Sequence, residues 1–394
     1  MINLSLVTIL KYEKKMNKIF IITFYIFIFF SFNANSIDTK AEQAIVVDFD
    51  TSEILFEKNS NQKVPPASMT KIMTAYVAFD RIVNSDLSIN DKCVVSPKAY
   101  KMGGSRTFLE IDDYVTIDEL LKGIIIQSGN DASVALAECL SGTEEDFAKI
   151  MNDYAKKLNM NNTNFLNSSG WPNDNHYSTV KDISIVSNEI IKKFPNLYSY
   201  FSEKNFIYND IDQPNRNRLL DLLQGVDGLK TGFTKKSGWG IAASAKKNKR
   251  RITVVINGTN STRSRKNESS NLLNWAFNQT NQTTLVKKDQ IIVNVDVWLG
   301  NKNSVNLIST NDIVSSLSFD QIQLLNSSIN YSKPIPAPIT KGTEYGKLII
   351  NIEGKPNITI PLVADESINK INPIFRVFSA IKYLIFGNSL NEKQ

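Results

Sequence analysis

Histidine is almost absent from this chain. Its 394 residues include one histidine, His176. A single histidine excludes metal sites built on several imidazoles and leaves one candidate for a Ser-His-Asp triad. His176 stands in the polar, turn-rich segment WPNDNHYST, which favours an exposed loop position over a catalytic one. The sequence therefore predicts a surface histidine and no metal site.

Cysteine is nearly as scarce, and a strong charge imbalance is missing. Cys93 and Cys139 lie 46 residues apart with no C-x-x-C pair, so zinc is not expected. A disulfide is open to them if the protein is exported; a buried free thiol suits Cys139 equally, in the apolar run DASVALAECL. The net charge of +6 is spread along the chain, and its densest run, KKNKRR at 246–251, indicates a solvated turn between strands. Nucleic-acid binding is therefore not expected.

Both ends carry apolar segments that are short for a bilayer span. Residues 19–32 read IFIITFYIFIFFSF after several lysines, the layout of a secretory signal. We predict a signal peptide over residues 1–36, with Met16 as an alternative start; an uncleaved anchor is the other interpretation. At the other end, residues 367–394 predict a basic amphipathic helix that lies in a membrane interface, or one that packs on its own domain.

Between the ends, the hydrophobic pattern divides the chain in two. Strand pairs are indicated at 41–60 and 239–258, and helical periodicity occurs at 117–140, 144–158, 181–194 and 269–278. Helices flanking a few strands predict one α+β domain over 37–284. Further on, short alternating segments between Gly, Pro and Asn turns predict a small all-β domain over 285–366.

The pattern S-x-x-K occurs six times, and context separates one occurrence from the rest. Ser68 alone follows a Pro-Pro pair and opens an amphipathic helix, in PPASMTKIMTAYV. Lys71 lies three residues on, on the same helical face. A lysine can accept the serine proton only when it is neutral, which requires burial or a second cation to lower its pKa. Taken alone, the pair equally fits an N-capping serine beside an exposed lysine.

A second motif, S-G-N, interrupts the helical run IIIQSGNDASVALA. The hydroxyl of Ser128 can relay a proton there, and the side chain of Asn130 can donate to a substrate amide. A helix cap is the simpler interpretation, because S-G-N-D is a good capping sequence. The motif therefore gains weight only in combination with others.

A third motif, K-T-G, lies in VDGLKTGFTKKSGWG. The ammonium of Lys230 and the hydroxyl of Thr231 suit a terminal carboxylate, and Gly232 lets a substrate backbone approach closely. A plain turn is the alternative, and residues 236–238 fit the same loose pattern. A phosphate loop is excluded, because the order G-K-[ST] is missing.

In this order, S-x-x-K, S-D-N and K-T-G are the signature of class A β-lactamases and penicillin-binding proteins. The middle element here is S-G-N, whose first and last residues still supply the hydroxyl and the amide. The sequence resembles the low-molecular-mass penicillin-binding proteins, the D-alanyl-D-alanine carboxypeptidases of serine peptidase family S11. Similar stretches extend beyond the motifs and include AIVVDFDTSEILFEKN, GGSRTFL, NTNFLNSSGW and VDGLKTGFT. The resemblance implies a β-lactamase/transpeptidase-like domain with an antiparallel sheet flanked by helices, a β-rich second domain and a C-terminal amphipathic anchor.

The resemblance also implies catalytic roles. Ser68 is expected to be the acylated nucleophile, Lys71 its general base and Ser128 a proton relay. The backbone N–H groups of Ser68 and Phe233 are expected to form the oxyanion hole. Phe233 is a departure, because this family often has histidine after K-T-G; catalytic rate and β-lactam affinity are thereby left open.

Substrate-binding roles follow in the same way. The resemblance implies that Asn130 holds the substrate and that Lys230 and Thr231 bind its terminal carboxylate. Lys230 is also expected to keep the lysine of S-x-x-K neutral by charge repulsion. Arg265 in STRSRKNES and Arg216 in PNRNRLL resemble carboxylate-facing arginines of the family.

The expected reaction is removal of the terminal D-alanine from peptidoglycan stem pentapeptides, without a metal or cofactor. β-Lactams are expected to acylate the same serine. The implied location is periplasmic, with the C-terminal helix attached peripherally to the outer face of the cytoplasmic membrane. Two alternatives remain: a β-lactamase of the same fold, for which residues 167–182 lack a clear Glu motif, and a non-catalytic wall-binding scaffold.

Overall fold

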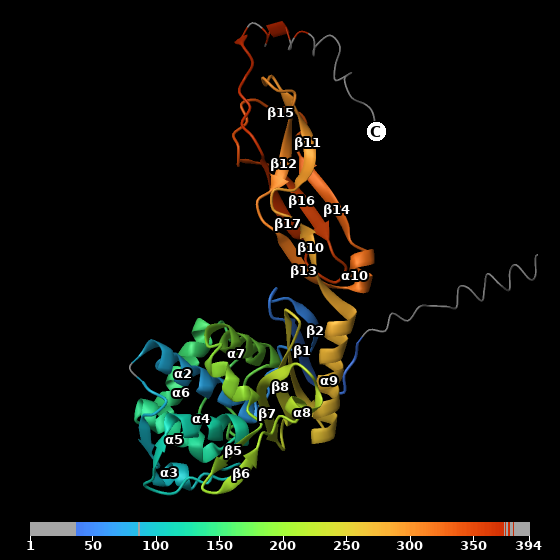
Figure 1. Cartoon of the computed structure of the whole chain (residues 1–394). Coiled ribbons are helices and arrows are strands. Elements are labelled where there is room, and N and C mark those ends of the chain that lie inside the picture. Colours follow the sequence, from blue (N-terminus) through green and yellow to red (C-terminus); the bar gives the residue numbers. More distant parts are fainter. Residues whose placement is uncertain (1–36, 86, 374, 376, 379–380, 382–394) are drawn as a thin grey trace, which may run out of the picture. The chain divides into compact units, whose positions relative to one another are not determined.

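The computed structural model describes residues 37–85, 87–373, 375, 377–378 and 381 (Figure 1). The predicted signal peptide, 1–36, lies outside these residues. Most of the predicted C-terminal helix does so as well, although Phe375, Val377 and Phe378 are described and exposed. Within the described part of the chain, no helix has both the length and the apolar character needed to cross a membrane.

The first architectural feature is a five-stranded sheet with strand order β2-β1-β9-β8-β7. Each neighbouring pair is antiparallel, as the resemblance implied. The strand pairs predicted at 41–60 and 239–258 are confirmed. The basic run at 246–251 contains the turn that joins the two strands of the second pair. The strands are β1 (Gln43–Asp48), β2 (Ile54–Lys58), β7 (Val226–Thr234), β8 (Gly238–Lys247) and β9 (Arg250–Thr259).

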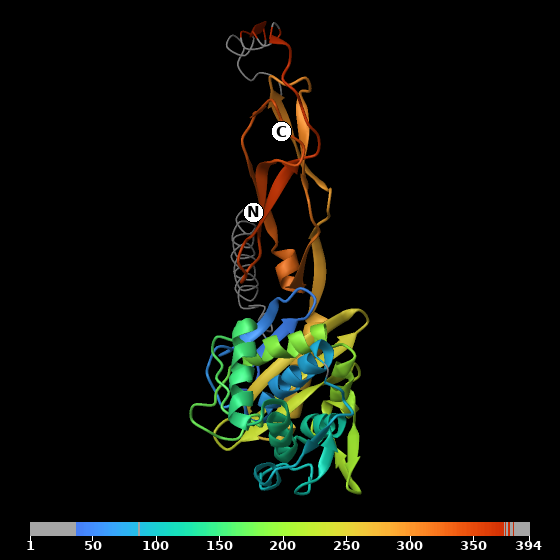
Figure 2. The same ribbon diagram turned by 90° about the vertical axis from the view of Figure 1, so that its left-hand side faces the viewer.

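Two helices cover opposite faces of this sheet (Figures 1 and 2). α9 (Thr262–Gln279) packs on β8 and β9, while α7 (Val180–Lys193) packs on β1 and β9. Successive residues of a strand point to opposite faces, so β9 serves both helices. The side chain of Thr253, for example, donates a hydrogen bond of 2.6 Å to Asn188 on α7.

Most of the remaining helices of this part of the chain form a layer on the α7 side, around α2 (Lys71–Asn84). Nine residues of α2, from its first lysine to Phe79, are buried, so this helix forms the centre of the helical core. It follows directly on the 3-10 turn η1 (Ala67–Thr70). The surrounding elements are α3 (Pro97–Tyr100), α4 (Ile117–Lys122), η2 (Gly123–Gln127), α5 (Asn130–Ser141), α6 (Glu144–Lys157) and η3 (Leu197–Ser202). The short helix α8 (Leu219–Leu222) instead packs on β7, near the start of α9.

The helix predicted at 117–140 is interrupted. η2 is a π-helical turn, and Ser128 after it adopts the left-handed conformation with φ of 70°. Such turns inside helices often mark functional sites. A disulfide joins Cys93 on the short strand β3 (Lys92–Val94) to Cys139 on α5, which resolves the alternatives left open for the cysteines. β3 pairs with β4 (Tyr114–Thr116), and β5 (Asn205–Tyr208) pairs with β6 (Ile211–Pro214).

The C-terminal part is all-β apart from one short helix, and it has its own hydrophobic core. A six-stranded sheet has the order β14-β16-β17-β12-β11-β15, and β10 pairs with β13. These elements are β10 (Thr280–Val286), β11 (Ile291–Trp298), β12 (Ser304–Ser309), β13 (Ile313–Ser318), α10 (Phe319–Gln323), β14 (Asn326–Tyr331), β15 (Ile335–Pro336), β16 (Glu344–Asn351) and β17 (Ile358–Ala364).

Candidate active site

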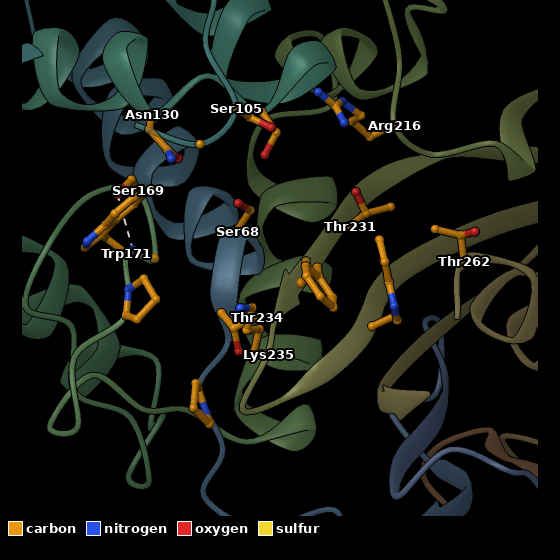
Figure 3. Close-up of a pocket in the computed structure, with 18 of the residues that line it drawn as sticks. Ser68, Ser105, Asn130, Ser169, Trp171, Arg216, Thr231, Thr234, Lys235 and Thr262 are labelled. Atoms are coloured by element: carbon orange, nitrogen blue, oxygen red, sulfur yellow. Dashed lines mark hydrogen bonds between the residues drawn. The ribbon is translucent and has the colours of Figure 1, made fainter. Parts of the chain in front are cut away.

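A cleft of about 1130 Å³ lies where the edge strand β7 meets the helical layer. Its lining comes from η1, the start of α5, the segment 169–174, β7 and α9. Figure 3 shows Ser68 between two walls. One wall carries Asn130, Ser169 and Trp171; the other carries Arg216, Thr231 and Thr262. The three motifs, which lie far apart in sequence, therefore meet at one cavity.

Ser68 is presented to the cleft by a tight turn. Pro66 precedes η1, and its carbonyl accepts a hydrogen bond of 3.1 Å from the N–H of Met69. Ala67 adopts a positive φ of 51°, which is uncommon for a residue other than glycine and often marks a functional position. Buried neighbours on both sides leave the Ser68 side chain half-buried at the cleft wall.

Lys71 is fully buried and makes three hydrogen bonds. Its Nζ donates to the Asn130 Oδ1 and to the Ser169 carbonyl oxygen, both at 2.7 Å, and to the Ser68 Oγ at 3.2 Å. Lys71, the first residue of α2, is therefore held in contact with Ser68, three residues before it. The alternative of an exposed lysine beside a capping serine is wrong, since neither η1 nor α2 has a side-chain cap.

Burial lowers the pKa of Lys71 to about 7, against the carboxylates of Asp131 and Glu144, which raise it. A substantial neutral fraction is thus present near neutral pH, as a general base requires. Burial also lowers the pKa of Lys230 well below its usual value, with Lys71, Arg216 and Arg265 acting in the same direction. Desolvation is therefore the leading cause for both lysines, and it takes the place of the charge repulsion by Lys230 that the resemblance implied for Lys71.

Ser128 and Asn130 stand on either side of the start of α5. The left-handed backbone at Ser128 ends the π-helical turn and leaves its side chain, 4% exposed, in the cleft lining. Asn130 links α2 to the loop that contains Gly103. Its Oδ1 accepts from Lys71, and its Nδ2 donates to the Gly103 carbonyl oxygen at 2.7 Å.

The K-T-G motif lies on the edge strand β7. Thr231, Gly232 and Phe233 line the cleft, whereas Lys230 is 1% exposed and lies beneath it. Gly232 was predicted to let a substrate backbone approach closely, but the structure gives its missing side chain another role. A Cβ at Gly232 would lie 3.0 Å from the Pro66 carbonyl oxygen, so it allows β7 to pack closely on η1. The serine turn and the K-T-G strand are thereby fixed against each other.

An aromatic pair and two arginines complete the far end of the cleft. Phe233 is 46% exposed and stacks on Trp239 of the neighbouring strand, with ring centroids 4.0 Å apart. The Arg265 guanidinium lies over the same indole, 5.4 Å from its centroid. Burial, and then the charge of Arg216, lower the pKa of Arg265 to about 10. Arg216 is itself held by a hydrogen bond of 3.2 Å to Gln127.

The expectation for His176 was wrong. This residue is 2% exposed and lies behind the active-site turn, not on the surface. Its Nδ1 accepts the N–H of Leu166 at 3.1 Å, so the ring proton is on Nε2, which donates to the Thr70 Oγ1 at 2.9 Å. Burial, and then the charge of Lys71, lower the pKa of His176 to about 4, so it is neutral at physiological pH. The polar sequence around it hid a buried residue that supports η1.

Sequence reasoning also missed several cleft residues. The Ser169 carbonyl oxygen accepts from Lys71, and Trp171 beside it is 45% exposed at the cleft wall. The segment SSGW was noticed, but a backbone acceptor has no signature in a sequence. Trp239 was missed because its place beside Phe233 depends on the sheet register. Arg218, directly before α8, was missed because it belongs to no motif. Among the described residues, no group of three or more His, Cys, Asp or Glu side chains is arranged to hold a metal ion.

Comparison with known proteins agrees with this geometry. The D-alanyl-D-alanine carboxypeptidase family model, Peptidase S11, matches residues 31–260, and the model of the penicillin-binding protein 5 C-terminal domain matches 281–370. D-alanyl-D-alanine carboxypeptidase DacF of Bacillus subtilis is 36% identical over 341 residues, 84% of this chain and 86% of the relative.

Solved structures give the same result. The structure of D-alanyl-D-alanine carboxypeptidase DacD from Francisella tularensis has a TM-score of 0.77 and 28% identity, covering 85% of this chain and 95% of that one. Penicillin-binding protein D2 from Listeria monocytogenes, solved in an ampicillin-bound form, has a TM-score of 0.57 and 28% identity, covering 61% and 99%. With the S-x-x-K, S-x-N and K-T-G residues gathered at one cleft, the chain belongs to the D-alanyl-D-alanine carboxypeptidase family, serine peptidase family S11.

Proposed function

We propose that this protein is a serine D-alanyl-D-alanine carboxypeptidase that removes the terminal D-alanine from peptidoglycan stem pentapeptides. The observation that carries the proposal is the contact between a fully buried Lys71 amine and the Ser68 hydroxyl. A lysine with a pKa of about 7 can hold a lone pair at the pH at which the cell wall is made. No other S-x-x-K pair in the described residues combines this burial with a cleft.

The acylation step begins with neutral Lys71. Its amine removes the proton of the Ser68 hydroxyl while Oγ attacks the carbonyl carbon of the last peptide bond. The backbone N–H groups of Ser68 and Phe233 stabilise the oxyanion. When the C–N bond breaks, Ser128 relays the proton to the departing amine of D-alanine. The product is an ester between Ser68 and the shortened peptide.

Substrate binding is assigned to the other residues of the cleft. Asn130 receives the peptide, while Thr231 and Lys230 attract its terminal carboxylate. Arg265 and Arg216 add positive charge at the same end; Arg265 is buried, which strengthens its interaction with an anion. Because the site binds the free carboxylate at the end of the peptide, the enzyme cleaves the last peptide bond and not an internal one.

Deacylation requires water at the ester carbonyl. Water adds to this carbon while one of its protons passes to the amine of Lys71. The ester C–O bond then breaks, the proton returns from Lys71 to the Ser68 Oγ, and the tetrapeptide is released. A β-lactam presents a strained amide and a carboxylate in a similar arrangement, so we propose that it acylates Ser68 as well. The ampicillin-bound relative supports this extension.

The proposed location is periplasmic, on the outer face of the cytoplasmic membrane. Residues 1–36 serve as the signal peptide, 37–284 form the carboxypeptidase domain, 285–366 the β-rich domain and 367–394 the anchor. The helical part of the anchor begins only at residue 373, because Ile368 is buried in the core of the β-rich part and pairs with Ile339. The exposed Phe375, Val377, Phe378 and Ile381 support an apolar helix face. Deletion of 373–394 is expected to move the protein from the membrane fraction to the soluble fraction, while its activity on a soluble peptide is retained.

The decisive experiment measures free D-alanine released from a stem pentapeptide. The wild-type enzyme is expected to release it, and Ser68→Ala is expected to abolish release while it retains the fold. Mass spectrometry of the penicillin-treated protein should place the adduct on Ser68. A fluorescent penicillin that is lost within seconds would indicate the β-lactamase alternative, and no D-alanine release at all would indicate the scaffold.

A further inference from the structure

A second hollow, of about 480 Å³, adjoins the catalytic cleft. The two cavities share four lining residues: Arg218, Thr231, Thr262 and Arg265. Beyond these, the hollow is lined mainly by α8 and by the first turn of α9, including Arg263 and Lys266. A volume of this order is typical of a small-molecule site, and the methyl side chain of D-alanine would leave it empty.

The hollow is strongly basic. Arg218, Arg263, Arg265 and Lys266 all line it, and within the described part of the chain none of them forms an ion pair with a carboxylate. The one acidic side chain in its lining, Asp221, pairs with Lys204 at 3.1 Å. Four cations gathered without counter-charges repel one another, so an anion bound here is stabilised by all of them.

The floor of the hollow is apolar. Leu219 and Ile241 line it and are 1% and 2% exposed. An apolar floor beneath cationic side chains suits an alkyl chain that ends in a carboxylate. The methylene groups can cover the floor, and the charged end can reach the arginines and the lysine.

The position of the hollow defines which part of a substrate reaches it. Thr231 and Arg265 are the residues to which the proposed function assigns the terminal carboxylate, and both line the hollow. The departing residue carries that carboxylate on its Cα. Its side chain leaves the same Cα, so a side chain longer than methyl can extend from the cleft into the hollow.

We propose that this hollow is a leaving-group subsite for a terminal D-amino acid whose side chain is a short alkyl chain ending in a carboxylate. The inference rests on the proposed function and extends its substrate class beyond D-alanine. The chemistry is unchanged: the C–N bond breaks, the departing amine takes a proton, and water later releases the acyl group from Ser68. The enzyme then also cleaves peptides whose leaving group is acidic and larger than D-alanine.

The test compares acyl-D-alanyl-D-X peptides that differ in the last residue alone. X is D-alanine, D-2-aminoadipate, D-norleucine or D-lysine. These last three have side chains of similar length with an acidic, neutral or basic end. We expect kcat/KM for D-aminoadipate to exceed that for D-lysine at least ten-fold at low salt. The ratio should shrink towards one in 0.5 M salt, because salt screens partly exposed charges.

Charge reversal identifies the residues responsible. Arg263→Glu with Lys266→Glu is expected to lower the aminoadipate-to-norleucine ratio at least five-fold. The matched control, Lys192→Glu with Lys249→Glu, makes the same change in net charge at exposed positions outside both cavities and should leave the ratio unaltered. Use of a ratio cancels any general loss of folded enzyme.

Two results separate this inference from the proposed function. Release of D-alanine from the D-alanyl-D-alanine peptide, with equal rates for the acidic and basic leaving groups, would overturn the subsite and leave the carboxypeptidase intact. An unchanged ratio in the Arg263→Glu, Lys266→Glu variant would overturn it too. Failure to release D-alanine from any peptide would remove the proposed function, and the subsite with it.

Discussion

At the residue scale, the active site depends on one amine that the fold keeps out of water. Lys71 has no exposed surface and three hydrogen-bond acceptors around it. An ammonium ion can serve all three acceptors at once, whereas a neutral amine has only two hydrogens. The amine therefore frees its lone pair for Ser68 when it loses its proton, at a pH set mainly by burial.

The first prediction concerns the pH dependence of acylation by a penicillin. Because the neutral form of Lys71 is the base and its pKa is about 7, the rate constant should rise about ten-fold per pH unit below 7 and level off above it. Lys71→Arg, which stays charged, should lose at least about a hundred-fold. Stopped-flow measurement with a chromogenic β-lactam gives both values. A flat profile from pH 5 to 9 would contradict the assignment.

The second prediction concerns His176 and stability. Its pKa is lowered from 6.5 to about 4 in the folded chain, so between these pH values only the unfolded chain binds the proton. The stability that His176 contributes is present above pH 6.5 and is lost as pH falls towards 4. The loss amounts to about 3 kcal/mol.

The measurement is urea unfolding of the wild type and of His176→Asn between pH 7 and 4. Asparagine retains an acceptor for the Leu166 N–H and does not titrate. The difference in unfolding free energy between the two proteins should therefore shrink steadily as the solution is acidified. A constant difference across this range would show that the imidazole is not held neutral by the fold.

At the element scale, close packing of β7 on η1 sets the geometry of the cleft. Gly232→Ala places a Cβ 3.0 Å from the Pro66 carbonyl oxygen and 3.2 Å from the Ala67 Cβ, so the serine turn must shift. We predict that the acylation rate constant falls about ten-fold, because a displacement of a few tenths of an ångström misaligns the nucleophile.

The control is Gly354→Ala in the β-rich domain. Its Cβ meets open space, but its φ of 74° strains any side chain. This variant should lose about 1 kcal/mol of stability and none of its acylation rate. If both variants acylate at the wild-type rate, the contact between β7 and η1 does not position the serine.

The sequence revealed elements with a clear period and obscured those shaped by packing. Strands near Ile45 and Val255 alternate or run apolar, and they were predicted close to their observed bounds. The helix around Ser128 was predicted with a break, but not with a π-helical turn, because a widened turn leaves the apolar spacing almost unchanged.

The active site likewise contains residues that the sequence predicts and residues that only the packing brings together. Side chains in ordered motifs, such as Ser68 and Asn130, could be predicted, since their spacing is written in the chain. The buried position of His176 could not, because it results from contacts with Thr70 and Leu166 that no local pattern encodes. The basic hollow was missed for a similar reason: Arg218 and Lys266 are brought together by the packing of α8 and α9 on the sheet.

At the scale of the whole molecule, the described residues contain two separate hydrophobic cores. One lies among the sheet and its helices, around residues such as Tyr76 and Leu136; the other lies within the β-rich part, around Leu307 and Leu362. Because the two cores are separate, we expect each to unfold as its own cooperative unit.

Calorimetry should therefore resolve two unfolding transitions. A reversible boronic acid bound at Ser68 should raise the midpoint temperature of only one of them. At a hundred-fold excess over its Kd, the ligand stabilises the unit that binds it by about 2.7 kcal/mol. A single transition that moves as a whole would mean that the two cores unfold together.

The cross-link between Cys93 and Cys139 has a consequence for the cell. The disulfide links β3 to α5, the helix that begins with Asn130. Formation of the complete active-site cleft therefore includes the oxidation of two thiols. If the protein is exported as proposed, this bond forms with the oxidising equivalents that are available outside the cytoplasm. We then expect a cell starved of them to accumulate uncleaved stem pentapeptides even at a normal level of the polypeptide.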